Sequence, residues 1–175
     1  MATPRNYWMV SVPSSYADVC REQGFTLLGM GKAHRKRAQR MEVGDRVLFY
    51  VSDEMVFAAV GSVSSTYFED ESPTWPSPDP EERFAWRVRL KPDVVLDAEH
   101  LIDARLLAPR MEYVKKWAPE LWPLAFQGLL HLVPKVDFAV VEREMRRGVL
   151  RPQVRLGQGI AEGAHCILDR MAAEA

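Results

Sequence analysis

Two apolar runs separated by a short polar gap constrain this fold more than any other feature. "RVLFYVS" (46–52) and "VFAAVGSVSSTY" (56–67) are rich in β-branched and aromatic residues, and Asp53 and Glu54 lie between them. This arrangement is typical of a β-hairpin. The segment Val43–Asp45 supplies turn chemistry just before the first run. Because an isolated hairpin is barely stable in water, further strands must pack on it.

Other segments supply those strands and the helices that cover them. Strands are predicted at residues 6–12, 83–92 and 129–134, and helices at 14–24 and 135–148. In the last helix Val136, Val140 and Val141 are expected on one apolar face. Strands that alternate with short helices and a hairpin predict an α+β fold: a small mixed β-barrel of about five or six strands flanked by short α-helices. A doubly wound parallel sheet is not expected.

Length and composition indicate one compact domain. The chain has 175 residues and is 47% hydrophobic, enough for one core. We expect residues 1–148 to form this domain and residues 149–175 to be a glycine-rich extension whose helix docks on it. We find no apolar run of membrane-spanning length and no secretory signal. Cys20 and Cys166 are expected to be reduced thiols, as in a cytoplasmic protein. We expect a monomer or weak homodimer.

A cluster of positive charge stands out in a chain whose formal net charge is −1. On a helical wheel His34, Ala38 and Met41 share one arc, and basic side chains cover the rest. Such a face either is solvated surface or contacts phosphates. The basic residues are Lys32, Arg35, Lys36, Arg37 and Arg40.

A long acidic loop follows the hairpin. Residues 69–82 contain four prolines and cannot form a regular element. Trp75 within this loop either fixes the loop to the domain or lines a pocket. Trp86 begins a strand and belongs to either a pocket or the core. In that strand Arg87 and Arg89 are expected to point away from the face that carries Trp86.

The remaining aromatic residues have less distinctive surroundings. Trp8 lies in a continuous apolar strand and is predicted to be core. Trp117 and Trp122 are predicted to be packing residues. Tyr50 and Tyr113 are weaker candidates for a binding pocket.

The order of these segments resembles the EVE domain family. "YWMVSVP", a helix, a basic stretch, "MEVGDRVLFYVS", "FAAVGSVSSTYFED", "PTWPSP", "WRVRL" and "LLHLVPKVDFAVV" follow one another between Asn6 and Arg147. That family belongs to the PUA-like superfamily and is related to YTH and ASCH domains. The resemblance implies a barrel flanked by helices. It also implies binding of a modified base, flipped out of DNA or RNA, in an aromatic pocket.

One departure from the family concerns the pocket. Members commonly carry a Trp-Gly pair after the first helix, whereas this chain has Leu28 before Gly29. The retained glycine still allows a ligand to approach the backbone closely. The missing ring leaves room for a different modified base, or for a flatter slot closed by Met30 and one tryptophan.

The sequence therefore predicts a reader that binds a modified base in DNA, uses no cofactor and catalyses no reaction. Unstacking a base costs a few kcal/mol, and stacking on aromatic side chains returns about 1–3 kcal/mol. The predicted base pocket comprises Ser11, Gly29, Met30, Tyr50, Trp75, Trp86 and Tyr113. The predicted phosphate contacts are the five basic residues of segment 32–40.

Three alternatives remain open. An ASCH-like amidohydrolase acting on modified nucleosides would need groups such as Lys32 and Glu69 to converge. An RNA-binding PUA-like module would use the same surface for RNA. A protein-interaction module would bury the aromatic residues and bind an acidic partner. A metal site is not expected, because the histidines are scattered through the sequence. They are His34, His100, His131 and His165.

Overall fold

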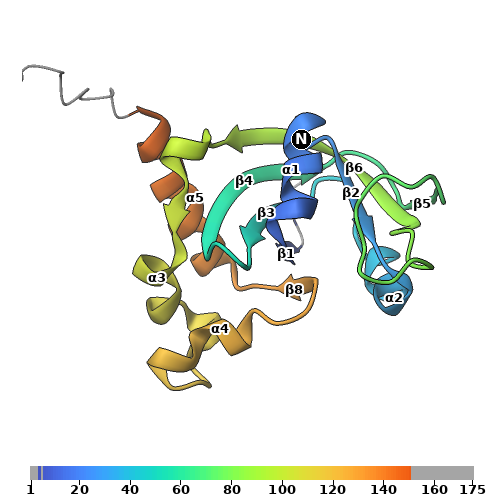
Figure 1. The fold of residues 1–175 in the computed structure, drawn as a ribbon. Helices are drawn as coiled ribbons and strands as arrows, with labels where there is room; N and C mark the ends of the chain where they lie inside the picture. Colours follow the sequence, from blue (N-terminus) through green and yellow to red (C-terminus); the bar gives the residue numbers. More distant parts are fainter. Residues whose placement is uncertain (1–3, 5, 151–175) are drawn as a thin grey trace, which may run out of the picture.

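The computed structural model describes residue 4 and residues 6–150, and its main element is one strongly curled sheet (Figure 1). The strands are β1 (Tyr7–Val12), β2 (Leu27–Met30), β3 (Arg46–Val51), β4 (Val56–Val63), β5 (Phe68–Glu69), β6 (Trp86–Val95), β7 (Ile102–Asp103) and β8 (Leu130–Leu132). The helices are α1 (Ser14–Glu22), α2 (Arg35–Ala38), α3 (Ala104–Leu107), α4 (Trp122–Ala125) and α5 (Lys135–Leu150). Short 3₁₀ turns are η1 (Lys32–His34), η2 (Ala98–His100), η3 (Ala108–Arg110), η4 (Glu112–Val114) and η5 (Pro119–Leu121).

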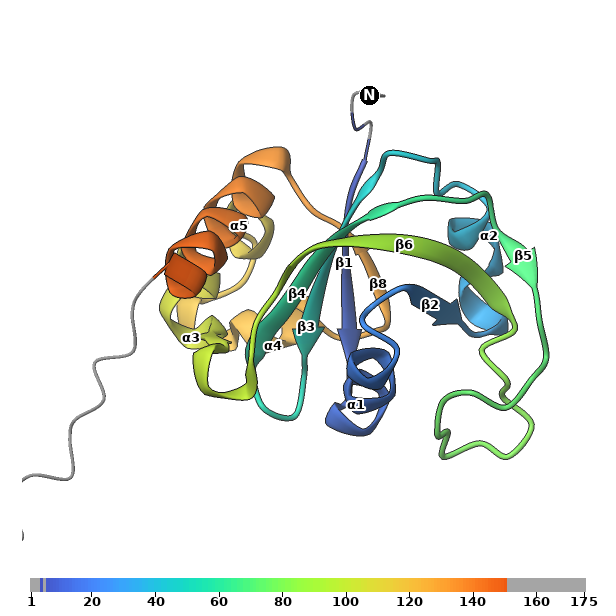
Figure 2. The same cartoon turned by 90° about the horizontal axis from the view of Figure 1, so that it is seen from above.

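The sheet is mixed and forms a half-barrel. Its strand order is β2-β6-β4-β3-β1-β8, with β5 paired to β6 and β7 to β4. The pair β1–β3 is parallel, while β3–β4, β4–β6, β2–β6 and β1–β8 are antiparallel. The long strand β6 arches across the sheet and joins its two halves (Figure 2). The predicted α+β fold class, a curled mixed sheet flanked by short helices, is thereby confirmed.

Alternating residues of the strands fill two apolar clusters on opposite faces of the sheet. In β1, Trp8 and Val10 belong to the cluster that α1 and β2 cover, and Met9 belongs to the other. The second cluster is covered by α3, α4 and α5. This alternation follows from the two-residue period of a strand. Trp8 is 1% exposed, which confirms its predicted place in the core.

One buried carboxylate ties the start of β1 to the turn before β3. Asp45 is 1% exposed and accepts four hydrogen bonds. Two come from the backbone and side chain of Asn6, at 3.1 Å each, and one comes from the Trp8 indole at 2.9 Å. The fourth is the Glu42 N–H at 3.1 Å. A buried anion requires such partners, and here they fix the parallel pairing of β1 with β3.

A second carboxylate connects the hairpin turn to α1. Asp53 accepts hydrogen bonds from the Ser14 N–H at 2.8 Å and from the Ser14 hydroxyl at 2.6 Å. The residue before the helix is Pro13, which makes no side-chain capping bond. The first turn of α1 is therefore capped by a residue from a distant part of the chain.

The last described helix differs from its prediction in length and in its buried face. Helix α5 continues past Gly148 to Leu150, where the described residues end. The buried residues are Asp137, Phe138, Val141 and Met145. Val136 and Val140 are 56% and 40% exposed, so their predicted packing was wrong. The reason is that Phe138 takes the core position, between Tyr7 and the Arg46 guanidinium. The predicted docked helix of the extension lies outside the described residues.

Replacement of Asp45 by Asn tests the buried carboxylate. Asp45→Asn keeps the volume, but when its oxygen keeps the three bonds made to Oδ2, its NH₂ group replaces Oδ1 and faces the backbone N–H of Asn6, donor against donor. We expect the free energy of unfolding in urea to fall by about 3 kcal/mol. The control Asp18→Asn changes an exposed carboxylate of α1 and should cost less than about 0.5 kcal/mol. Equal losses in the two variants would contradict a structural role for Asp45.

Candidate nucleic-acid interface

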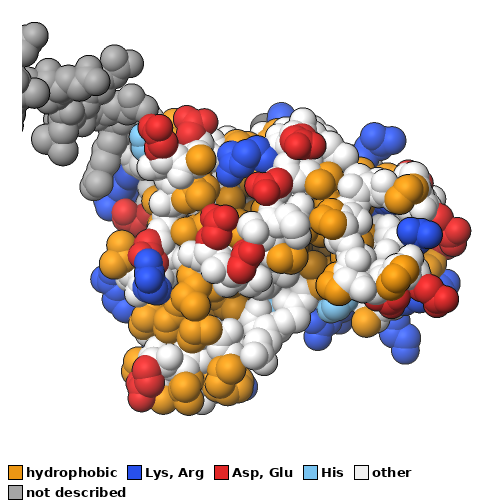
Figure 3. Space-filling model, viewed as in Figure 1, with side chains coloured by type: hydrophobic (Ala, Val, Ile, Leu, Met, Phe, Trp, Pro, Cys, Tyr) orange, Lys and Arg blue, Asp and Glu red, His pale blue; other side chains and the backbone are white. Residues whose placement is uncertain are grey.

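The basic segment forms η1 and α2 at one end of the sheet. Ala38 and Met41 anchor it, at 0% and 3% exposed, while its five lysines and arginines are all exposed. Figure 3 shows Lys and Arg side chains gathered along the lower right edge, over α2. His34 is half-buried, as expected from the predicted arc. The segment therefore presents a positive surface on an apolar base.

Two of these cations hold defined positions on either side of α2. The Arg35 guanidinium lies 4.5 Å from the centre of the Trp86 ring, a cation–π distance. Arg37 donates a hydrogen bond to the carbonyl oxygen of Leu130 in β8. Helix α2 thus lies between the start of β6 and the edge strand β8.

An aromatic stack covers the backbone of β2. The Trp75 ring lies flat on the Tyr16 ring, with centroids 5.0 Å apart and planes 8° apart. It also lies directly over Gly29, where a Cβ atom would come within 2.3 Å of the indole. Tyr16 Oη donates to the Gly29 carbonyl at 2.7 Å and accepts from the Gly29 N–H at 2.9 Å. Only glycine at this position lets a ring lie on the strand.

The indole of Trp75 is enclosed in the present structure. Its side chain is 6% exposed, and its N–H donates to the Cys20 sulfur at 3.4 Å. Burial raises the pKa of the Cys20 thiol to about 12, so the sulfur is protonated and unreactive at neutral pH.

A buried arginine holds the proline-rich loop in place. Arg87 is 1% exposed, although it lies on the face of β6 that points away from Trp86, as predicted, and its burial was not expected. It pairs with Asp70 at 2.9 Å, donates to the Ser72 hydroxyl at 3.0 Å and lies 5.1 Å from the Trp75 ring centre. The loop covers this face of β6, which buries Arg87 but leaves Arg89 exposed.

Met30 and Trp86 lie beside this stack. They are register partners on β2 and β6; Met30 is buried and Trp86 is half-buried. The Trp86 ring is also 6.2 Å from the Tyr67 ring. Gly29, Met30, Trp75 and Trp86 therefore form one neighbourhood around the β2–β6 pair next to α2, with Trp75 on the face of Gly29 and the Met30 and Trp86 side chains on the opposite face.

Ser11 and Tyr50 lie elsewhere. They are partners across β1 and β3 and line a hollow of about 520 Å³ with Pro123 and Phe126. Tyr50 is 2% exposed and packs on Phe57 and Phe126 in the second apolar cluster. Burial raises the pKa of Tyr50 to about 12.

Tyr113 lies in a third place, a cavity of about 730 Å³ that Arg37 and Arg40 also line. The seven predicted pocket residues are thus distributed over three sites. The predicted packing role of Trp122, which is 5% exposed, is confirmed, whereas Trp117 is 43% exposed and lines this cavity.

Sequence reasoning missed Tyr16 and Arg87 as partners of Trp75. The spacing of Tyr16 and Cys20, one helical turn apart on α1, is the one signal that marks a shared buried face.

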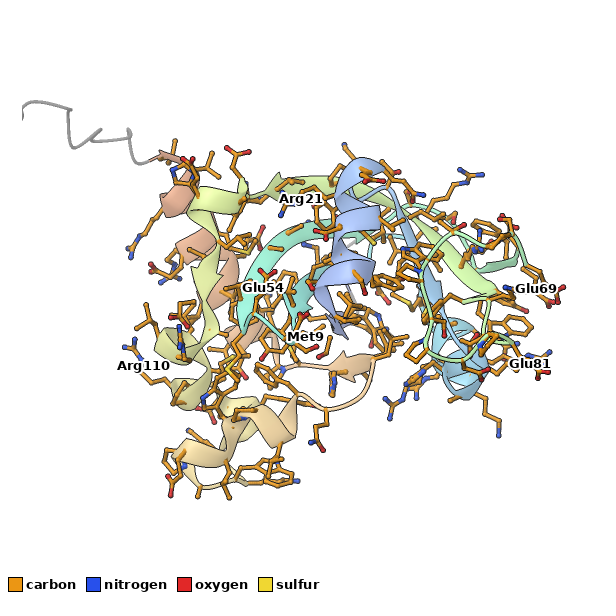
Figure 4. All side chains as sticks on the ribbon, in the orientation of Figure 1. Met9, Arg21, Glu54, Glu69, Glu81 and Arg110 are labelled. Atoms are coloured by element: carbon orange, nitrogen blue, oxygen red, sulfur yellow. The ribbon has the colours of Figure 1, made fainter. Side chains whose placement is uncertain are left out.

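The described residues contain no group of three or more His, Cys, Asp or Glu side chains that could hold a metal ion. Acidic residues of the proline-rich loop such as Glu69 and Glu81 are exposed, and in Figure 4 they project from its outer edge. The Lys32 N–H donates to the Glu82 carboxylate at 3.2 Å.

The sequence matches the EVE domain family over residues 6–120. The chain belongs to this family. A UPF0310 protein of Pyrococcus abyssi is 22% identical over 148 residues, which cover 78% of this chain and 97% of the relative.

Solved YTH domains have the same fold. The YTH domain of the Zygosaccharomyces rouxii MRB1 protein, in complex with N6-methyladenosine RNA, superimposes with a TM-score of 0.60. It is 16% identical, and the match covers 83% of this chain and 91% of that domain. An Mmi1 YTH domain in complex with RNA gives a TM-score of 0.57 at 11% identity, over 82% and 79% of the two chains. Within residues 4 and 6–150, no helix has both the length and the apolar character needed to cross a membrane.

Replacement of Gly29 by Ala tests the contact between this EVE domain's β2 backbone and Trp75. A Cβ atom at 2.3 Å from the indole must displace the ring and expose Cys20. In a Cys166→Ser background, we expect Cys20 to be alkylated by iodoacetamide roughly tenfold faster. The free energy of unfolding should fall by about 1–3 kcal/mol.

A matched control separates local displacement from general loss of stability. Val141→Ala removes a fully buried side chain from the other apolar cluster. When the two variants have the same free energy of unfolding, Cys20 should be alkylated more slowly in Val141→Ala than in Gly29→Ala. If the two variants react equally fast, the ring does not depend on Gly29.

Proposed function

We propose that this protein is a non-enzymatic reader that binds a modified base flipped out of DNA. The base is received at β2, where Gly29 exposes the backbone and Trp75 and Tyr16 supply flat aromatic faces. Phosphates on either side of the base contact the exposed cations of η1 and α2. Membership of the EVE family supports a binding role of this kind.

The observation that carries the proposal is the position of these cations next to the aromatic neighbourhood of β2 and β6. Arg35 stacks on Trp86, Trp86 is the partner of Met30, and the residue before Met30, Gly29, lies under Trp75. A flipped base needs both features at once, since stacking offsets the cost of extrusion and cations bind the flanking backbone.

Base binding at β2 requires the indole of Trp75 to leave Tyr16. The stack is closed at a centroid distance of 5.0 Å, which leaves no space for a third ring between the two. The loop that carries Trp75 is tied down through Arg87, so its displacement is the conformational step of binding. Leu28, where relatives commonly have tryptophan, is fully buried and adds no aromatic face to the slot.

RNA is the second candidate substrate. Two domains of the same fold were solved with RNA, one of them carrying N6-methyladenosine. Neither the aromatic faces nor the cations of α2 distinguish a ribose from a deoxyribose, so the preference for DNA or RNA is measured directly. The proposal includes a cytoplasmic location and a monomer or weak homodimer in solution.

A binding titration tests the proposal. Matched single- and double-stranded DNA and RNA oligonucleotides, each with one unmodified, methylated or hydroxymethylated base, are titrated at two salt concentrations. We expect one modified base to bind roughly tenfold or more tightly than its unmodified form, because a single methyl group can supply that discrimination in a fitted pocket. The preference should persist at the higher salt. Equal binding of all oligonucleotides would overturn the reader proposal.

Charge reversal tests the phosphate surface. The triple variant Arg35→Glu, Lys36→Glu and Arg40→Glu should weaken binding to all oligonucleotides alike and reduce the salt slope of log K by about 3, one per lost contact.

The matched control makes the same change of charge on the opposite side of the molecule. Its substitutions are Arg105→Glu in α3, Arg110→Glu in η3 and Arg143→Glu in α5. Its salt slope should stay within about one contact of the wild-type slope. Equal slopes in both triple variants would rule out α2 as the phosphate-binding surface.

A further inference from the structure

A second cavity lies on the other side of α2 from the Trp75 stack. It has a volume of about 730 Å³ and opens between α2, β8 and the segment from η4 to α4. Trp75 and Gly29 do not contribute to it. Besides Arg37, Arg40 and Tyr113, its lining includes Lys116, Trp117, Gln127 and His131. This volume is sufficient for one nucleotide.

The charge of the cavity favours an anion. Arg37, Arg40 and Lys116 line it, and the single acidic residue of its lining is Glu112. The Glu112 carboxylate already accepts a hydrogen bond from the Lys115 ammonium group. Arg37 is held in place by the Leu130 carbonyl. The cavity therefore presents a partly preorganised positive wall.

A hydrogen-bonded pair fixes the polarity of the opposite wall. The Gly128 carbonyl can only accept, so Nε2 of His131 carries a proton and donates to it at 2.8 Å. Burial, together with the nearby Arg37 charge, lowers the pKa of His131, so the ring is neutral at pH 7. Its Nδ1 then accepts the proton of the Tyr113 hydroxyl, at 2.8 Å.

The tyrosine oxygen is consequently left as an acceptor. Its only proton is directed at His131, so its free lone pairs can accept a hydrogen bond from a donor group of a ligand. An exocyclic amine, as in adenine or cytosine, supplies such a donor, whereas a carbonyl at the same position, as in hypoxanthine or uracil, meets lone pair with lone pair.

An exposed apolar face completes the cavity. Trp117 is 43% exposed, and Leu124 and Leu132 beside it are 38% and 42% exposed. Such a wall suits a stacked base, because the flat face of a base packs on an aromatic ring.

We propose that this cavity binds one nucleotide with an amino-bearing base, adenine or cytosine. The exocyclic amine donates to Tyr113 Oη, the base stacks on Trp117, and the phosphate contacts Arg37, Arg40 and Lys116. The proposal deepens the proposed function and rests on it for the source of the nucleotide: because α2 borders both sites, a strand whose modified base enters at β2 can place a neighbouring nucleotide here. A free nucleotide offers the same groups.

Calorimetric titration with mononucleotides tests the cavity on the full chain. AMP should bind roughly tenfold more tightly than IMP, and CMP more tightly than UMP, as expected for one hydrogen bond replaced by a repulsive contact. Tyr113→Phe should abolish both preferences, and Trp117→Ala should weaken all four ligands roughly tenfold. The control Tyr67→Phe alters an exposed tyrosine outside this cavity and should leave the preferences unchanged.

His131→Leu separates base recognition from a purely structural role. It releases the Tyr113 proton, so the hydroxyl can donate as well as accept, and the preference for AMP over IMP should disappear while AMP still binds. Equal binding of AMP and IMP to the wild-type protein, or a preference that survives Tyr113→Phe, would overturn the proposal.

Oligonucleotides identify the source of the nucleotide. Strands carrying the preferred modified base are compared with adenine or uracil as its neighbours. A preference for adenine that requires Tyr113 assigns the cavity to a neighbouring nucleotide of the strand. Indifference to the neighbour, combined with Tyr113-dependent binding of AMP, assigns it to a free nucleotide. The two proposals fail separately: a modified-base preference without AMP binding overturns only the cavity, and AMP binding without that preference overturns only the reader.

Discussion

The Asp45 carboxylate is the interaction on which the rest of the sheet depends. Three of its four hydrogen bonds join Asn6 and Trp8 to the turn before β3, and the fourth, from the Glu42 N–H, lies within that turn. This attachment sets the register of the parallel pair, and the parallel pair sets which residues of β1 face each cluster. A slip of one residue would turn Trp8 toward the second cluster and Met9 toward the first. The position of α1, and with it Tyr16 under Trp75, follows from this register.

A buried arginine plays the corresponding part for the candidate base site. Arg87 supplies donors to Asp70 and Ser72 on the loop and lies next to the Trp75 ring. The loop is rich in proline and has no regular structure of its own, so its shape derives from what it is attached to. Because the loop is attached through Arg87, it holds the flat side chain of Trp75 in a defined place while the site is closed.

The fold was largely predictable from the sequence, because the hairpin, β6 and β8 each carry local apolar patterns. The cations of α2 were equally visible, since a run of charge over a buried Ala38 and Met41 indicates an amphipathic turn. Residues whose role depends on distant segments were not. Arg87 has the alternation of a solvent-facing residue and is buried only because the loop covers it. Asp45 has the sequence surroundings of a turn residue, and its buried role becomes visible only when Asn6 and Trp8 lie beside it. Trp117 was predicted to pack because nothing local marks a cavity wall.

The cap that Asp53 provides for α1 has a consequence for the order in which the chain folds. A helix of nine residues without its own capping side chain is too short to persist alone. Its first-turn acceptor comes from the turn of the β3–β4 hairpin, 39 residues further along the chain. Helix α1 is therefore completed only after the hairpin has formed, although it precedes the hairpin in the sequence. Helix and hairpin therefore form one cooperative unit, and the stack of Trp75 on Tyr16 depends on both, because Tyr16 lies on this helix.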